Sequence, residues 1–280
     1  MKPATPLRLV STDFDGTIHA DFSHGPVPVA LQSRLKSLQT AGALWIINTG
    51  RDLPSLMESI GRSRMEVMPD YVVAVEREIY RHVGGHFEPV QPWNNRCHAD
   101  HEALFTNHAE ELRALGRSLE ERYDATFYAD GWSPLCVIAR NNTQMDAIQA
   151  EFETFTESIP EVVAVRNDVY SRLSHRSYSK GTALAEIQRL TGLTAADTFA
   201  AGDHLNDLPM LQPQFARWLA TPSNGLPVVK AQVAGHGGYI AARTCGDGVL
   251  EALDAWFPHS GGPRGLRSNC NPPPRIRRRC

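Results

Sequence analysis

The stretch LVSTDFDGTIHA (residues 9–20) places two carboxylates, Asp13 and Asp15, directly after a short apolar run. The apolar residues predict a buried strand over residues 7–12 that ends at the first aspartate. Two like charges this close disfavour each other's ionisation and destabilise the local structure. The glycine that follows them, Gly16, is typical of a turn. A pair of acids at the end of a buried strand therefore needs compensating charges from elsewhere in the chain.

Segments of strand and helix character alternate after this stretch. The spacing of apolar residues predicts helices over 29–42 and 52–61, and apolar runs predict strands over 43–47 and 71–76. This alternation predicts an α/β fold, a Rossmann-like, doubly wound parallel sheet with helices on both faces. In such a sheet, ligands bind beyond the carboxyl ends of the strands, which is where the two aspartates fall.

The pattern changes in the middle of the chain. A hairpin, a charged helical stretch and several short strands predict a small α+β unit over residues 84–173, and the alternating pattern returns after it. We therefore expect a discontinuous core domain, formed by residues 1–83 and 174–257, with residues 84–173 inserted as an α+β cap domain. Residues 258–280 are rich in glycine, proline and arginine, which predicts a disordered tail.

Composition narrows the class of protein. The chain has 280 residues, of which 42% are hydrophobic and 21% charged, and no apolar run reaches the length of a membrane helix. Its five cysteines are scattered without a CxxC motif, so we expect a reducing, cytoplasmic location rather than a disulfide framework or a zinc site. Outside the tail, 22 basic residues stand against 31 acidic ones, so we expect neither a nucleic-acid partner nor a membrane partner.

Histidines in the predicted cap raise the question of a second metal site. His98, His101 and His108 lie near Glu102, but their spacing matches no standard site and HExxH is absent. We expect these residues to form a solvated helix face.

Four polar motifs fall at predicted strand ends or helix starts of the core: DFDGT (13–17), TGR (49–51), SKG (179–181) and GDHLND (202–207). Each alone is explained by a turn, a solvated arginine or a helix N-cap. Together they bring four carboxylates to one edge of the sheet, where mutual repulsion requires cations. Mg²⁺ prefers carboxylate oxygens, so the pattern indicates a metal and phosphate site. Its charged residues are Asp13, Asp15, Asp203, Asp207, Lys180 and Arg51.

In this order, the four motifs resemble those of the haloacid dehalogenase-like (HAD) phosphatases. The place and character of the insert resemble the C2-type cap of the Cof-type and sucrose-phosphate-phosphatase-like subclass, and the resemblance covers most of residues 7–257. It implies a Mg²⁺-dependent phosphatase that hydrolyses a small phosphorylated metabolite, a sugar phosphate, through an aspartyl-phosphate. A phosphomutase on the same fold and a catalytically silent phosphate-binding protein remain as alternatives. The resemblance implies no oligomeric state.

The resemblance also implies roles for the acidic residues. Asp13 would be the nucleophile and Asp15 the general acid and base. Asp13 and Asp203 would bind Mg²⁺ through carboxylate oxygens, and Asp15 through its backbone carbonyl. Lys180 would neutralise charge on both Asp13 and the phosphate.

The remaining motif residues would surround the phosphate. Thr49, the amide of Gly50 and Asn206 would bind its oxygens, together with Lys180. Asp207 would orient that lysine or a metal-bound water. Arg51 would either assist these groups or pair with an acid.

One motif departs from this subclass. An Asn-Gly pair usually follows the third strand, whereas VEREIY (residues 75–80) stands there in this chain. Glu76 or Arg77 would therefore line the mouth of the site and alter its choice of substrate. Four cap residues are candidates for substrate contact, with ordinary cap surface as the alternative: Asp130, Trp132, Arg172 and His175.

Overall fold

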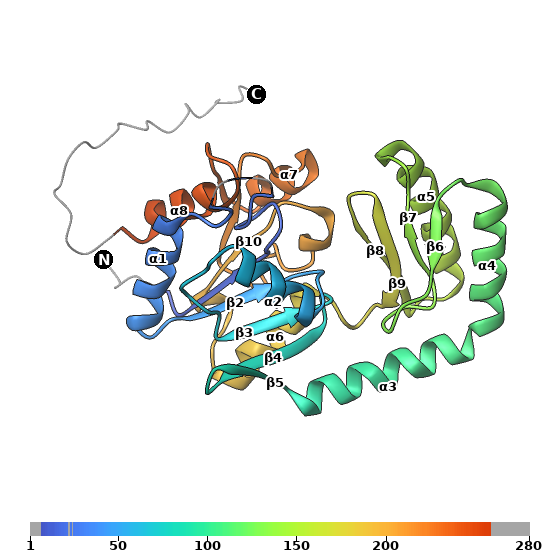
Figure 1. Cartoon of the computed structure of the whole chain (residues 1–280), viewed down its shortest axis with the longest axis horizontal. Coiled ribbons are helices and arrows are strands. Elements are labelled where there is room, and N and C mark those ends of the chain that lie inside the picture. The colour runs from blue at the N-terminus through green and yellow to red at the C-terminus, as the bar shows by residue number, and fades with distance from the viewer. Residues whose placement is uncertain (1–6, 22, 24, 259–280) are drawn as a thin grey trace, which may run out of the picture.

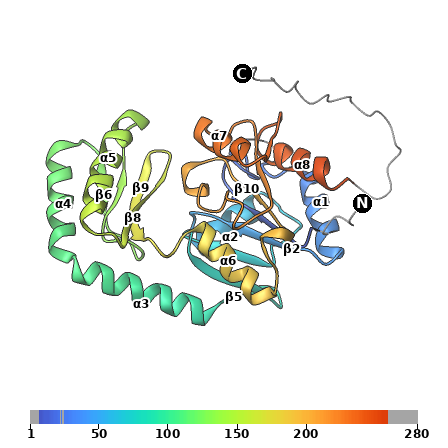
Figure 2. The same cartoon turned by 180° about the vertical axis from the view of Figure 1, so that it is seen from behind.

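The computed structural model describes residues 7–21, 23 and 25–258, so the predicted tail lies outside the described residues from 259 onward. Two lobes lie side by side (Figure 1). The larger contains both ends of the described chain, and the smaller is connected to it by a long helix and a returning strand. Seen from behind, the same helix, α3 (Gln91–Asn107), runs from the larger lobe along the edge of the smaller one (Figure 2).

The larger lobe is built on an eight-stranded sheet, which confirms the predicted α/β core. The six strands from β12 to β3 are parallel, and β4 and β5 add an antiparallel edge. In spatial order the strands are β12 (Tyr239–Ile240), β11 (Trp218–Thr221), β10 (Thr198–Ala201), β1 (Leu9–Thr12), β2 (Leu44–Asn48), β3 (Tyr71–Ala74), β4 (Glu78–Val83) and β5 (His86–Pro89).

Helices cover both faces of this sheet. Successive residues of a strand point to opposite faces, so Val10 of β1 packs in one apolar cluster and Leu9 in the other. The first cluster includes residues of α1 (Val29–Thr40), α2 (Leu53–Arg62) and α8 (Cys245–Trp256). The second includes residues of α6 (Lys180–Thr191) and α7 (Pro227–Gly235). Strands buried on both faces explain why the sequence shows continuous apolar runs there.

Local signals fix the helix that carries Lys180. The side chain of Ser179 accepts a hydrogen bond from the amide of Thr182 and forms a capping box at the start of α6. Gly192 ends the helix in the left-handed conformation, with a φ of 67°. The lysine therefore occupies the first turn of α6, beside the carboxyl end of the sheet.

The smaller lobe contains a four-stranded antiparallel sheet in the order β6, β7, β9, β8. Its own apolar cluster includes Leu119, Phe152 and Leu173, all fully buried. The bounds of its strands are β6 (Thr126–Tyr128), β7 (Cys136–Ile138), β8 (Val162–Asn167) and β9 (Tyr170–His175), and those of its helices are α3 (Gln91–Asn107), α4 (Ala109–Arg122) and α5 (Asn142–Ser158). We call this lobe the cap.

Sheet membership corrects the predicted limits of the insert. The boundary at residue 84 falls in the β4–β5 hairpin, and both of its strands belong to the core sheet. The chain leaves this sheet after Pro89, and the last cap strand ends at His175. The inserted segment therefore runs from about residue 90 to 175 rather than from 84 to 173. The charged helical stretch predicted within it is two helices that meet at His108.

No helix among the described residues is both long enough and apolar enough to span a bilayer.

Candidate active site

The predicted acids meet where β1 and β10 end side by side. Thr12 lies opposite Ala201 in the parallel register, and the amide of Asp13 donates to the carbonyl of Ala201 over 2.9 Å. Asp13 therefore directly follows β1, and the Gly202–Asp203 turn directly follows β10 beside it. Parallel pairing alone brings together two acids that are 190 positions apart in sequence.

Lys180 links two of the carboxylates. Its side chain is fully buried, and Nζ lies 2.7 Å from Asp13 Oδ1 and 2.6 Å from Asp207 Oδ1. Burial disfavours the charged amine, but the neighbouring carboxylates outweigh it, so the pKa of Lys180 is raised above its usual range. The lysine is therefore a permanent positive charge at the centre of the site. Asn48 at the end of β2 donates to its backbone carbonyl over 2.9 Å and holds the start of α6 in place.

Negative charge exceeds positive charge around this lysine. One oxygen each of Asp13, Asp203 and Asp207 lies within 4.8 Å of the others. Burial, then the charge of Asp207, raises the pKa of Asp203 to about 7. Burial also raises the pKa of Asp13 well above its usual range, and the charge of Lys180 only partly opposes this. Three carboxylates thus surround the single positive charge of Lys180, and burial adds to the cost of ionising them.

Mg²⁺ fits this excess of carboxylate oxygens. Asp207 is already engaged, because Oδ1 binds Lys180 and Oδ2 accepts from the amides of Asp203 and His204. Asp13 and Asp203 are therefore the side chains suited to hold the ion, and Asp207 is suited to orient the lysine. Thr17 donates to Asp203 Oδ1 over 2.6 Å and fixes the orientation of that carboxylate.

Gly16 permits the close approach of the two motifs. It has a φ of +73°, and a Cβ atom built on it would lie 2.4 Å from Asp203 Oδ2. Any side chain at this position would displace the Asp203 carboxylate. Asn224, in the loop that follows β11, donates to the carbonyl of Gly16 over 2.7 Å and supports the same turn.

Asp15 is turned away from the cluster and has its own cation. Arg51 donates to it twice, from Nε to Oδ2 over 2.6 Å and from Nη2 to Oδ1 over 2.7 Å. Arg51 was expected either to assist the phosphate-binding groups or to pair with an acid, and the structure shows the ion pair. Ser59 accepts a third bond from the guanidinium over 2.9 Å. The two aspartates of DFDGT therefore have separate cations, Lys180 and Arg51.

The residues expected to bind phosphate also lie together. Thr49 directly follows β2 and is buried, and its hydroxyl accepts from the amide of Arg51 over 3.1 Å. A Cβ atom on Gly50 would lie 3.7 Å from Asn206 Nδ2 and 3.3 Å from Glu76 Oε1. The threonine–glycine turn and Asn206 thus face one space, and Glu76 borders it.

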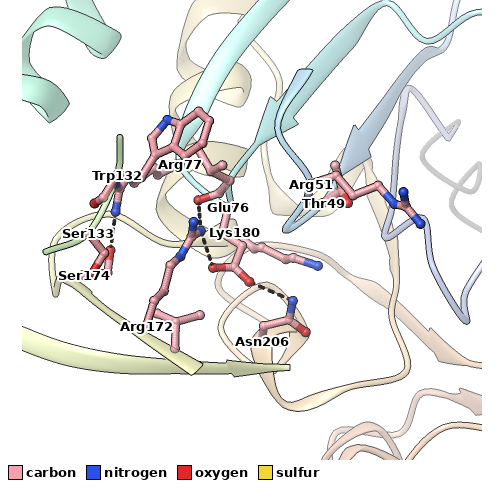
Figure 3. Close-up of polar contacts among 12 residues, drawn as sticks. Thr49, Arg51, Glu76, Arg77, Trp132, Ser133, Arg172, Ser174, Lys180 and Asn206 are labelled. Carbon is pink, nitrogen blue, oxygen red and sulfur yellow. Dashed lines mark hydrogen bonds and ion pairs between the residues drawn. The ribbon is translucent and has the colours of Figure 1, made fainter. Parts of the chain in front are cut away.

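Only one of the four candidate cap residues reaches this space. Arg172 of β9 forms an ion pair with Glu76, with Nη2 3.0 Å from Oε2 (Figure 3). Trp132 instead donates to Glu78, and the Asp130 carboxylate accepts from two amides of its own turn. His175 packs against the rings of His101 and Tyr178.

The histidines of the cap do not form a metal cluster among the described residues. His98 is largely exposed, as expected, and lies 2.8 Å from Glu78. His101 is buried, which contradicts the expected solvated face. Its Nδ1 bonds the carbonyl of Cys97, and Nε2 accepts from the amide of His175 over 3.0 Å.

Sequence reasoning missed two supports of the site, Thr17 and Asn224. Thr17 belongs to the DFDGT motif, so its position in the sequence next to the acids could have predicted a hydrogen bond to one of them. It also missed a cavity of about 460 Å³ between core and cap. This cavity is lined by Glu76, Lys180 and Asn206 from the core and by residues 163–166 of β8.

Comparison with known proteins identifies a family for this chain. A family model described as haloacid dehalogenase-like hydrolase matches residues 104–253, which is more than half of the chain. A phosphoglycolate phosphatase of Methanoculleus marisnigri is 33% identical over 81 residues. That segment covers 29% of this chain and 32% of the relative, so the match spans about a third of that protein.

Solved structures share the whole fold. A sucrose-phosphatase from Synechocystis sp., in complex with sucrose and phosphate, has a TM-score of 0.69 and 19% identity over 90% of this chain and 98% of that one. A subclass IIB sugar phosphatase of the HAD superfamily has a TM-score of 0.60 and 17% identity, covering 89% and 98%. At these identities the likeness shows the fold alone, cap included.

Proposed function

Because the chain belongs to the haloacid dehalogenase-like hydrolases, we propose that it is a Mg²⁺-dependent phosphatase that hydrolyses a small phosphorylated metabolite. The observation that carries this proposal is the buried Lys180, bonded to Asp13 and Asp207 beside the unbalanced carboxylate of Asp203. A structural ion pair would not need a third buried acid. A site for a phosphate and a divalent cation does need it.

Asp13 supplies the nucleophile. Its Oδ1 is held by Lys180, and its carboxylate attacks phosphorus while the bond from phosphorus to the ester oxygen breaks. The product of this step is an aspartyl-phosphate on Asp13 and an alcohol. Mg²⁺, held by Asp13, Asp203 and the backbone carbonyl of Asp15, supplies electrostatic stabilisation of the phosphoryl oxygens when bound. Lys180, Thr49, the Gly50 amide and Asn206 add hydrogen bonds to the same oxygens.

Asp15 moves the protons. It donates a proton to the ester oxygen as that oxygen leaves, and then takes a proton from the water that attacks the aspartyl-phosphate. This second step releases inorganic phosphate and restores Asp13. To donate its proton, Asp15 must present one oxygen to the ester oxygen, whereas here Arg51 donates to both of its oxygens. We therefore propose that Arg51 releases one oxygen of Asp15 when substrate binds.

The substrate that the site favours is a sugar phosphate. The cavity of about 460 Å³ beside Lys180 is large enough for a monosaccharide and has polar groups from both lobes. The sucrose-phosphatase with the same fold supports this choice. We also propose a cytoplasmic location, since Cys97, Cys136 and Cys245 are free thiols.

The test is release of inorganic phosphate from a panel of sugar phosphates, 2-phosphoglycolate and p-nitrophenyl phosphate. We expect turnover with Mg²⁺ and its loss in excess EDTA, restored by added Mg²⁺. Formation of an isomerised sugar phosphate without free phosphate would identify a phosphomutase instead. Binding of phosphate with no turnover of any ester would identify a silent binding protein and contradict the proposal.

A further inference from the structure

The turn after β3 is strained and carries no glycine. Val75 and Glu76 have φ angles of 45° and 67°, in the left-handed region that a β-branched residue rarely adopts. Such strain persists only where surrounding contacts hold it, and it concentrates at functional sites. The contacts around this turn therefore hold a strained backbone beside the predicted phosphate site.

The backbone of the turn is bonded to the phosphate-binding loop. The amide of Glu76 donates to the carbonyl of Thr49 over 2.8 Å, and the amide of Val75 donates to the carbonyl of Arg51 over 2.8 Å. In return, the amide of Thr49 donates to the carbonyl of Val73 over 2.9 Å. A shift of the 75–76 turn would therefore move the loop that presents Thr49 and Gly50.

The Glu76 side chain extends this connection to the other phosphate-binding residue. The residue is only 6% exposed, and its Oε1 accepts from Asn206 Nδ2 over 2.8 Å (Figure 3). Glu76 thus contacts Thr49 through its backbone and Asn206 through its carboxylate. One residue fixes the spacing of both segments.

The cap holds this residue from the opposite side. Arg172 of β9 is 3% exposed, and its Nη2 donates to the carbonyl of Val75 over 2.5 Å and to Glu76 Oε2 over 3.0 Å. Its Nε is buried and finds no acceptor among the described residues. Figure 3 shows the guanidinium directed at Glu76, with Lys180 beyond it. Arg172 therefore restrains both the backbone and the side chain of the strained turn.

We propose that Glu76 and Arg172 are positioning residues, through which the position of the cap controls the geometry of the phosphate pocket. This inference rests on the proposed phosphatase function. With the pair intact, the strained turn holds the Thr49–Gly50 loop and Asn206 at the spacing that binds a phosphoryl group. Without it, the turn relaxes and phosphate binding weakens for every substrate. Arg172 acts through Glu76 and does not contact the leaving group.

The test compares the wild-type protein with the double variant Arg172→Met/Glu76→Gln. Removing both charges avoids leaving one buried charge unpaired. We expect the inhibition constant of inorganic phosphate to rise by about tenfold or more, because small misplacements at a site have large effects. We expect kcat/KM to fall by the same factor for acetyl phosphate, whose leaving group is too small to reach the cap, and for a sugar phosphate.

A control variant and two direct measurements show whether the effect is specific to the Glu76–Arg172 pair. Arg122→Met removes an exposed cap arginine that pairs with Glu151, and it should change neither constant. Calorimetric titration with inorganic phosphate in the presence of Mg²⁺ measures binding without turnover, and thermal unfolding shows the fraction of folded protein.

The outcomes separate the alternatives. A loss confined to the sugar phosphate, with phosphate binding unchanged, would make Arg172 a substrate contact and overturn the proposal. Lower thermal stability with unchanged phosphate binding would make the pair purely structural and also overturn it. A wild-type protein that binds phosphate but hydrolyses no ester would refute the proposed function alone, and the titration would still decide the role of the pair. Absence of phosphate binding in the wild-type protein would refute both.

Discussion

Two ion pairs illustrate the difference between the carboxyl edge of the core sheet and the cap. Lys180 is fully buried and bonded to Asp13 and Asp207, with a third acid close by. On the cap, Arg122 and Glu151 pair at the surface, where 45% and 32% of their side chains are exposed. Exposed pairs contribute little to stability, whereas buried charges are costly unless they are paired.

Apolar packing, in contrast, is a feature of the cap and not of the carboxyl edge of the core sheet. The cap has its own cluster around Phe152, Leu119 and Leu173, which folds its sheet and helices together. At the core edge, the side chains beyond the strands are acids, a lysine and a threonine. The cap is thus stabilised by ordinary packing, and the core edge keeps an arrangement of charges that chemistry explains better than stability. The changes below test this separation.

The largest effect is expected for Lys180→Met. It removes the cation that holds Asp13 and partly balances the buried acids. We expect kcat/KM for p-nitrophenyl phosphate to fall by about a thousandfold, which corresponds to about 4 kcal/mol of transition-state stabilisation. Steady-state kinetics with saturating Mg²⁺ measures it. Activity within a few-fold of the wild type would show that the buried pair is structural and would remove the contrast between the two regions.

A smaller effect, and on stability rather than rate, is expected for Phe152→Ala in the cap. The ring is fully buried in the cap cluster, so its loss should lower the free energy of unfolding by about 3 kcal/mol. Urea denaturation measures this change. Folded protein should keep nearly the wild-type kcat/KM for acetyl phosphate. A loss of rate as large as that of Lys180→Met would contradict the division of roles.

The smallest of the three effects concerns pH. Burial and the charge of Arg77 lower the pKa of His101 to about 3. Nδ1 of its neutral ring donates to the Cys97 carbonyl and Nε2 accepts from the His175 amide, so protonation at Nε2 would break the second of these contacts. The stability it contributes is complete above the unfolded pKa of about 6.5 and is lost as pH falls toward 3.

The wild-type protein should therefore lose about 2 kcal/mol from this group between pH 7 and pH 5. His101→Gln should lose less over the same range, because glutamine does not titrate. Urea denaturation of both proteins at the two pH values measures the difference. Equal pH dependence in the two would show that His101 is not held neutral.

Much of the core could be predicted because its signals are local. Asp52 and Ser179 cap their helices and Gly192 ends α6, and these residue types are typical of those positions. The four motifs could be brought together because the ends of parallel strands share one edge. Pairing of Asp13 with Lys180 then follows from the placement of α6 beside that edge.

The rest depends on contacts that sequence spacing does not encode. A hairpin signal at Gly84 shows where the chain turns but not which sheet the strands join, so the predicted boundary at residue 84 assigns β5 to the cap. The short strand β12, with two residues, gives no periodic signal. The bond of Arg172 to Glu76 spans 96 positions and needs a left-handed turn without glycine, which no local rule predicts.

The central claim is that Asp13 is a nucleophile, and trapping the aspartyl-phosphate tests it most directly. The protein would be mixed with phosphate-labelled acetyl phosphate and Mg²⁺, quenched in acid, digested and examined by mass spectrometry. We predict a phosphoryl group on Asp13, absent in Asp13→Asn, whose turnover should fall by roughly a thousandfold or more. The exposed cap variant Asp124→Asn should retain both label and turnover. Release of phosphate by Asp13→Asn at the wild-type rate, with no labelled aspartate in the wild type, would contradict the account.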